Sequence, residues 1–232
     1  MGTAINVVAI IVGGAIGLLL GPRLPERVRQ TVVAGMGLFT LAYALKQFFT
    51  TANALLVLGA ILIGALLGEW WGIEAGMARL GSWLEQKFST PAVDGATGSS
   101  TFVRGFLSAS LIFCIGPMAI LGAIQDGVTG DYSTLAIKSI LDGFIALAFA
   151  SSLGVGVLFS ALPILVYQGA ITLLAVQVQT VVTPAMMTEM TAAGGIILMG
   201  VAVSSLLEIR PIRAGNFLPA LVVAPILAAI FL

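Results

Sequence analysis

The sequence predicts an all-α integral membrane protein with about eight transmembrane helices, and three features of its composition indicate this. Of 232 residues, 59% are hydrophobic and only 9% are charged, whereas soluble domains carry about 25% charged residues. Ten basic and ten acidic side chains are too few to cover a water-exposed surface of this size. The 28 glycines also suit membrane helices, in which glycine is more frequent than in soluble ones.

Eight segments are long and apolar enough to cross a bilayer, since a span needs about 20 mostly apolar residues. They cover residues 2–20, 31–49, 53–68, 102–124, 134–159, 162–182, 191–207 and 217–232. We interpret the first as a retained helix and not a signal peptide, because no basic segment precedes it and no clear small-residue cleavage site follows it.

The stretch between the third and fourth spans has a different character. In residues 70–88, apolar side chains recur at helical spacing, at Ile73, Met77, Leu80, Leu84 and Phe88. The same stretch holds all three tryptophans, a residue that favours the membrane interface. We therefore expect an amphipathic helix lying on the membrane, followed by a turn-rich, flexible linker at 89–101.

Basic residues predict the orientation, because they gather in cytoplasmic loops. With eight spans, one side of the membrane receives Arg23, Arg27, Arg29, Arg79, Lys87, Arg104, Arg210 and Arg213. Lys46 alone falls on the opposite side, and Lys138 falls inside the fifth span. This bias places both termini on the non-cytoplasmic side.

The two ends of the chain resemble each other, residues 31–49 with 191–209 most clearly. The resemblance suggests a single membrane domain, 1–232, with an inverted 3+2+3 organisation. Its parts are repeat unit A (1–69), the interfacial helix and linker (70–101), a two-span central element (102–160) and repeat unit B (161–232). Inverted repeats recur in secondary transporters; the alternative is independent hairpins without pseudo-symmetry.

The fourth span contains Gly116–Pro117 next to Cys114. Pro117 cannot donate to the carbonyl of Phe113 and its ring crowds that oxygen, so we expect a kink or break. Lipid cannot satisfy the freed carbonyl. The break could line a binding site, or it could be a simple proline kink packed against neighbouring helices.

Lys138 and Asp142 are four residues apart in the fifth span and hence on one helix face. A charged group at this depth costs roughly 2.5–3.5 kcal/mol on insertion scales, so the two should pair. Ser139 adds a neighbouring hydroxyl, and Asn6 in the first span could bond across helices. The pair could belong to a substrate or proton pathway, or it could be a static ion pair that fixes helix register.

Gln125 and Asp126 end the fourth span, where Asp126 could face a vestibule or bulk water. We include both in the candidate pathway. Asp131 or Ser133 is expected to cap the following helix by accepting its free N–H groups.

Several function classes are disfavoured. Zero net charge argues against a nucleic-acid partner, and the absence of histidine removes the commonest metal ligand and proton shuttle. There is no phosphate-binding GxxxxGK[ST] motif and no HExxH motif, so we expect neither an ATP-driven motor nor an enzyme, and no cofactor. An intramembrane aspartyl enzyme using Asp126 and Asp142 is a remote alternative, and a metal ligand set is not predicted either way.

The opening MGTAINVVAIIVGGAIGLLLGPRLPERVRQT and the stretch FCIGPMAILGAIQDGVTGDYSTLAIKSILDG resemble a bacterial family of multi-pass inner-membrane proteins, catalogued as domain of unknown function 554. The resemblance covers essentially the whole chain. It implies a bacterial cytoplasmic membrane and one full-length domain. It supplies no substrate and no functional residue.

Together these features predict a small secondary transporter or channel-like permease for a small solute or ion, with a polar site at mid-membrane. Its surroundings would be the lipid bilayer, and a homo-oligomer is compatible with the sequence. The alternative is a non-transporting membrane protein that scaffolds or regulates a partner through the interfacial helix.

Overall fold

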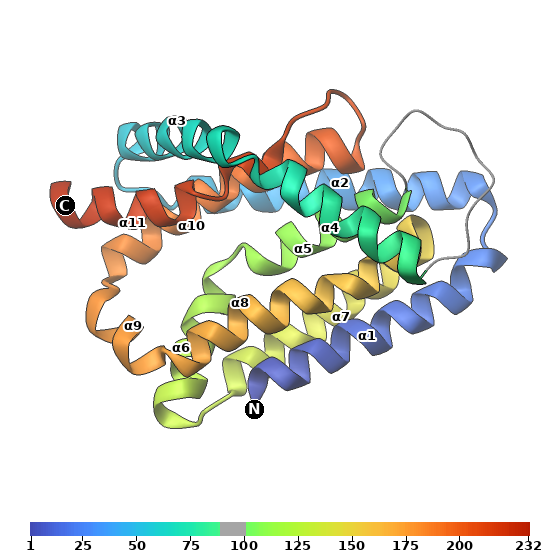
Figure 1. Cartoon of the computed structure of the whole chain (residues 1–232), viewed down its shortest axis with the longest axis horizontal. Helices are drawn as coiled ribbons and strands as arrows, with labels where there is room; N and C mark the ends of the chain where they lie inside the picture. The colour runs from blue at the N-terminus through green and yellow to red at the C-terminus, as the bar shows by residue number, and fades with distance from the viewer. Residues whose placement is uncertain (89–100) are drawn as a thin grey trace.

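The computed structural model describes residues 1–88 and 101–232, and this part of the chain is helical without strands. Figure 1 shows long helices running roughly side by side along the longest dimension of the molecule. The main helices are α1 (Gly2–Leu20), α2 (Glu26–Phe48), α3 (Ala54–Trp71), α4 (Ile73–Phe88), α5 (Thr101–Cys114), α6 (Pro117–Thr129), α7 (Ser133–Leu153), α8 (Ala161–Leu173), α9 (Ala175–Val181), α10 (Pro184–Val201) and α11 (Ala220–Phe231). Within the described residues, seven segments are long and apolar enough to cross a membrane, and the bent pair α5–α6 makes an eighth.

Some helices begin or end at other residues than the predicted spans, because a capping interaction and not hydropathy sets the helix end. α1 has the predicted bounds, but α10 begins at Pro184 and not at residue 191, because the Thr183 side chain accepts the N–H of Met186 at 3.2 Å. α3 continues to Trp71 and ends at Gly72, whose φ of 62° is left-handed. The interfacial helix predicted from residue 70 therefore starts at Ile73.

The predicted fifth and sixth spans also change. α7 ends at Leu153, because Gly154 adopts φ 80°, and the 3-10 turn Val155–Ser160 leads into α8 instead. The predicted span 162–182 divides into α8 and the short α9, with Leu174 between them. Residues 155–173 then form the sixth apolar crossing.

The helices form two groups on either side of α5. One group contains α2, α3, α10 and α11, and the other contains α1, α6, α7 and α8 (Figure 1). α1 and α7 pack closely enough that a Cβ on Gly13 would lie 2.1 Å from the carbonyl oxygen of Gly143, and one on Gly17 would lie 2.2 Å from that of Leu147. Small residues permit such close backbone approach in membranes.

Three helix pairs that join the two ends of the chain run antiparallel. In the α1–α8 pair, Thr3 lies against Thr172 and Asn6 against Gln168. In the α3–α11 pair, a Cβ on Gly64 would meet Ala220 at the start of α11, and one on Gly68 would meet Asn216 in the 3-10 turn just before it. α2 and α10 pack in the same sense, because Gly37 adjoins Leu207 whereas Gly195 adjoins Ala44.

α4 is a separate helix that packs over the beginning of α5, where Leu84 joins a buried cluster with Phe102, Val103 and Phe106. Its membrane-surface position stays a prediction. The linker predicted at 89–101 lies outside the described residues, except for Thr101, which begins α5.

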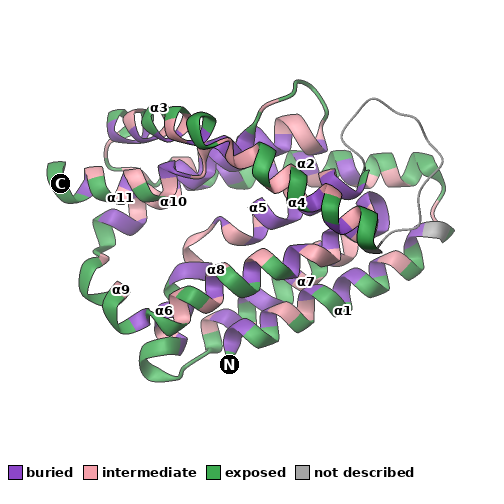
Figure 2. Cartoon of the chain, in the orientation of Figure 1, coloured by how far each residue is buried: buried purple, intermediate pink, exposed green. Residues whose placement is uncertain are grey.

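Figure 2 shows exposed residues along the outer flanks of the bundle, and many of these residues have large hydrophobic side chains. Val8 is 58% exposed, Leu66 74% and Leu173 85%. Apolar surface this extensive is not left against water by a soluble monomer, so these flanks face lipid.

Candidate functional site at the broken helix

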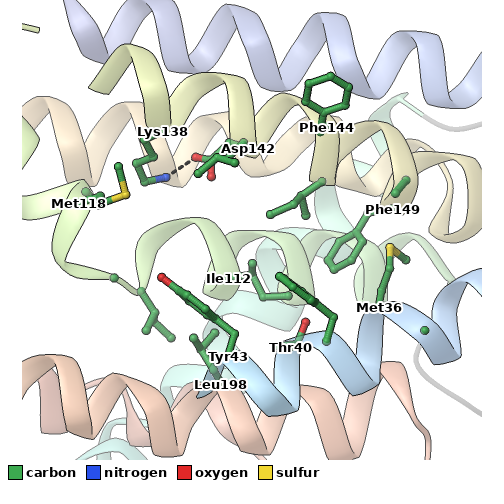
Figure 3. Close-up of a pocket in the computed structure, with 18 of the residues that line it drawn as sticks. Met36, Thr40, Tyr43, Ile112, Met118, Lys138, Asp142, Phe144, Phe149 and Leu198 are labelled. Atoms are coloured by element: carbon green, nitrogen blue, oxygen red, sulfur yellow. Dashed lines mark hydrogen bonds and ion pairs between the residues drawn. The ribbon is translucent and has the colours of Figure 1, made fainter. Parts of the chain in front are cut away.

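A cavity of about 550 Å³ lies where the α5–α6 break meets α2, α7 and α10. Figure 3 shows the side chains that line it, with the Lys138–Asp142 pair at one end and Phe149 and Met36 at the other. Its size is within the usual range of small-molecule pockets, about 300–1,000 Å³. The lining residues are Val32, Gly35, Met36, Phe39, Thr40, Tyr43, Ile112, Ile115, Gly116, Pro117, Met118, Ala119, Lys138, Leu141, Asp142, Phe144, Ile145, Ala148, Phe149 and Leu198.

The break itself forms one wall. α5 and α6 meet at 61°, and the regular hydrogen bonding of α5 stops with the bond from Ile115 N to the Leu111 carbonyl, 3.0 Å. Gly116 adopts φ 151° and ψ 146°, a conformation essentially restricted to glycine, and Pro117 starts α6 in a position that suits its fixed φ. The break lies at the predicted position. It leaves carbonyl oxygens at the end of α5 and N–H groups at the start of α6 beside the cavity.

The ion pair lies on the opposite wall. The Lys138 ammonium donates to Asp142 Oδ2 across one helical turn, and the two side chains are each 8% exposed. Ser139 faces elsewhere and donates to the Leu135 carbonyl at 2.6 Å. The two charged groups can neutralise each other at this depth, as the spacing predicts.

Buried amides extend this polar region across α1 and α8. Asn6 Nδ2 donates to Gln168 Oε1 at 3.1 Å, and both residues are 0% exposed. Asn6 is also close enough to interact with the Asp142 carboxylate. Asn6 Oδ1 and Gln168 Nε2 have no hydrogen-bond partner, so the cluster has spare bonding capacity.

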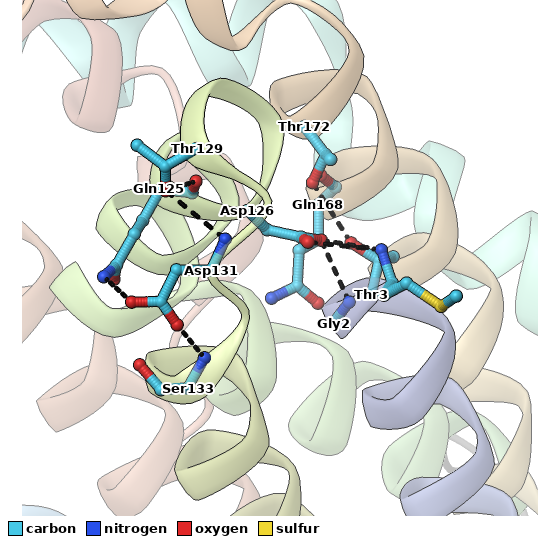
Figure 4. A network of polar contacts seen from close by, with 10 residues as sticks. Gly2, Thr3, Gln125, Asp126, Thr129, Asp131, Ser133, Gln168 and Thr172 are labelled. Atoms are coloured by element: carbon cyan, nitrogen blue, oxygen red, sulfur yellow. Dashed lines mark hydrogen bonds and ion pairs between the residues drawn. The ribbon is translucent and has the colours of Figure 1, made fainter.

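Two predicted pathway residues lie in a second polar network at the other end of α6 (Figure 4). The buried Asp126 carboxylate accepts the N–H of Gly2 at 2.9 Å and the terminal amine of Met1 at 3.0 Å. Gln125 donates to Asp131 at 2.7 Å, and Asp131 accepts the first N–H of α7 from Ser133 at 2.9 Å. Neither Gln125 nor Asp126 lines the cavity.

The structure thus brings together Gly116, Pro117, Lys138 and Asp142 around one cavity, with Asn6 directly behind the pair. Cys114 packs in the neighbouring core cluster and does not line the cavity. Among the described residues, no group of three or more carboxylate or thiol side chains could hold a metal ion.

The contribution of α2 was missed in the sequence. Thr40 and Tyr43 lie three residues apart on one face of α2 and supply polar groups opposite the ion pair. Two polar residues three positions apart in an otherwise apolar span lie on one helix face, and this spacing could have predicted a polar face on α2. The contact between Gln168 and Asn6 joins residues 162 positions apart, so no local pattern in the sequence reveals it.

The fold and the cavity define the class: an all-α, multi-pass membrane protein with a broken helix beside a buried ion pair. The chain belongs to the family described as Protein of unknown function (DUF554), whose sequence profile matches residues 1–229.

Two relatives are similar over nearly their whole length. "Uncharacterized protein YqgA" of Escherichia coli (strain K12) is 33% identical over 99% of this chain and 96% of its own. "Uncharacterized membrane protein YdfK" of Bacillus subtilis (strain 168) is 29% identical over 97% of this chain and 94% of its own. No solved structure matches the chain significantly.

Proposed function

We propose that the protein is a small secondary transporter or channel-like permease of a bacterial inner membrane. The observation that carries the proposal is the coincidence of three features around one cavity: a broken helix, a buried ion pair and an open volume of about 550 Å³. Interrupted helices at mid-membrane are a recurring way to build substrate and ion sites. The proposal assigns no catalytic reaction to Asp126 or Asp142.

The helix packing supports the inverted repeat on which alternating access would depend. An in-plane two-fold axis pairs each helix of repeat unit A with an antiparallel partner in repeat unit B. The pairs α1–α8, α2–α10 and α3–α11 run in this sense. With no ATP motif, transport would be driven by a solute or ion gradient.

Cysteine accessibility tests whether water reaches the cavity. The only native cysteine is Cys114, so Cys114→Ala provides a background for single cysteines at Thr40 or Met118, which line the cavity. A membrane-impermeant cationic methanethiosulfonate reagent, applied to oriented vesicles from one side at a time, should modify both positions. Alternating access predicts modification from each side.

The matched control is Val8→Cys, on the lipid-facing flank of α1, which should resist the reagent from both sides. If the cavity cysteines are as unreactive as the control from both sides, no aqueous path reaches the cavity. That result would contradict transport and favour the non-transporting scaffold.

A further inference from the structure

The cavity opens on the flank of the bundle, between α2 and α7. Phe39 of α2 and Phe144 of α7 line it and are each 69% exposed, and Leu141 is 51% exposed. These side chains belong to the middle of membrane-spanning helices. A molecule can therefore enter this cavity sideways from the hydrocarbon of the bilayer.

The cavity combines a large apolar lining with charge at one end. Aromatic and aliphatic side chains make up most of the lining, and Lys138 and Asp142 are the only charged residues among the described residues that line it. Both are nine-tenths buried or more, at 7% and 5% exposure. An occupant that matches both parts has an apolar body and one polar or charged head group.

The charge balance determines what must accompany an anionic head group. Lys138 and Asp142 together are neutral, so an anion that binds Lys138 leaves a net negative charge unless a proton arrives with it. Asp142 can take that proton once the anion has replaced it on the lysine. The balanced step is the binding of one carboxylate to the Lys138 ammonium and of one proton to the Asp142 carboxylate.

Asn6 provides the partner that a protonated Asp142 needs. Its side chain interacts with the Asp142 carboxylate, and its buried Oδ1 has no hydrogen-bond donor. A carboxylic acid O–H is a donor, and the Asn6 amide would offer it this oxygen after turning over.

We propose that the cavity takes an amphiphilic monocarboxylate, an acid with a single hydrophobic chain, together with one proton, from the membrane leaflet through the opening between α2 and α7. This inference names the substrate class of the proposed transporter and rests on that function for its transport step. The other titratable groups facing Asp142 are Lys138 on α7, the Cys114 thiol on α5 and the Tyr43 phenol across the cavity on α2. α1 contributes no titratable side chain.

Photo-crosslinking in nanodiscs tests the head group. Three probes carry the same diazirine-bearing ten-carbon chain and end in a carboxylate, a trimethylammonium or an alcohol. The carboxylate should label α2 and α7 peptides that line the cavity at least five-fold more than the other two, and excess decanoate should compete. The double variant Lys138→Met/Asp142→Asn has no charge at the site and should lose the preference for the carboxylate probe. The matched control Lys46→Met lies on the exposed surface of α2 and should keep this preference.

The proton is tested with Asp142→Asn, whose amide resembles the protonated acid. In the native protein, carboxylate labelling should fall as pH rises from 6 to 9. In Asp142→Asn the labelling should persist at pH 9 and be nearly independent of pH. The titration of the probe itself is common to both proteins, so it cannot produce the difference.

Equal labelling by all three probes, or no effect of the Lys138→Met/Asp142→Asn variant, would overturn the proposal. Crosslinks between two copies through the α2–α7 opening would overturn it too, because the opening would then be an interface. Failure of the substrate class and failure of the transport function give different results. If the cavity cysteines react but the carboxylate probe is not preferred, only the substrate class is contradicted. Acid labelling with unreactive cysteines would contradict transport and leave a binding site.

Discussion

Lys138 and Asp142 show how far single residues can be interpreted from the sequence. Their spacing of four along one helix predicts the pair, because neighbours at this separation share a face. The amides behind them were not predictable as a cluster, since Asn6 and Gln168 come together only when α1 packs on α8. Gln125 and Asp126 looked equally suited to a pathway, but packing against α7 and the start of α1 places them elsewhere.

Removing one member of the ion pair should cost much more than removing both. Lys138→Met or Asp142→Leu leaves a charge buried among apolar side chains, which costs about 3–5 kcal/mol of unfolding free energy when a buried pair is broken. The double variant Lys138→Met/Asp142→Leu has no charge to bury, so its stability should lie within about 1 kcal/mol of the native protein or above it. Unfolding of the purified proteins in mixed micelles by sodium dodecyl sulfate measures all three. Additive losses in the double variant would show that the two residues do not act as a pair.

Glu189 is a buried carboxylate that joins α10 to the turn between α2 and α3. It is 0% exposed on α10, and its carboxylate accepts the Thr51 hydroxyl at 2.5 Å and the Ala52 N–H at 2.8 Å. Glu189→Ala would remove two hydrogen bonds to a charged acceptor, and such bonds contribute about 1.5–3 kcal/mol each. We expect a loss of this size in the same micelle assay. Glu26→Ala on α2, whose contacts with Arg29 and Gln30 lie on the exposed surface and should contribute about 0–1 kcal/mol, serves as the comparison. Equal losses of unfolding free energy for the two substitutions would contradict this structural role of Glu189.

At the scale of whole elements, hydropathy located the crossings but not their ends. Composition cannot reveal that Thr183 starts α10 early or that Gly154 stops α7, because these depend on backbone geometry at single positions. The α5–α6 break was predictable, because proline both lacks the N–H and clashes with the preceding turn. Its angle and the cavity beside it depend on α2 and α7, which are distant in the sequence.

Gly116 should be far less tolerant of a side chain than an ordinary helical glycine. Its backbone at φ 151° and ψ 146° is strained for any residue with a Cβ, so Gly116→Ala should cost about 1–3 kcal/mol although no atom lies within 4 Å of the added carbon. Gly76→Ala is the matched control, because this helical position on α4 is equally open and alanine favours a helix by about 1 kcal/mol. The thermal unfolding temperature should therefore fall for Gly116→Ala and rise for Gly76→Ala. A neutral Gly116→Ala would mean that the break relaxes toward a continuous helix.

At the scale of the whole molecule, the all-α membrane architecture followed from composition and span length, and the family match agrees with it. The pairing of helices from the two ends was suggested by a weak sequence likeness alone. The structure adds that these pairs are antiparallel, that α2–α10 and α3–α11 pack closely through glycines, and that α1–α8 is joined by polar side chains. Close packing of this kind is visible only in three dimensions, because its partners are more than 100 residues apart.

Orientation in the membrane is a property of the entire chain, and it can be tested with reporters. Eight crossings put both termini on one side, and the basic loops that join the helices should lie in the cytoplasm. Alkaline phosphatase fused after Leu232 should therefore be active, because it folds only outside the cytoplasm, and a green fluorescent protein at the same place should be dark. Truncation with fusion after Arg210, in the loop before α11, should reverse both signals. An inverted repeat requires an odd number of crossings between equivalent points of the two units, and each unit must have the same number of spans. Matching signals at Leu232 and Arg210 would mean that α11 does not cross the membrane, and this would contradict the eight-span topology and the repeat together.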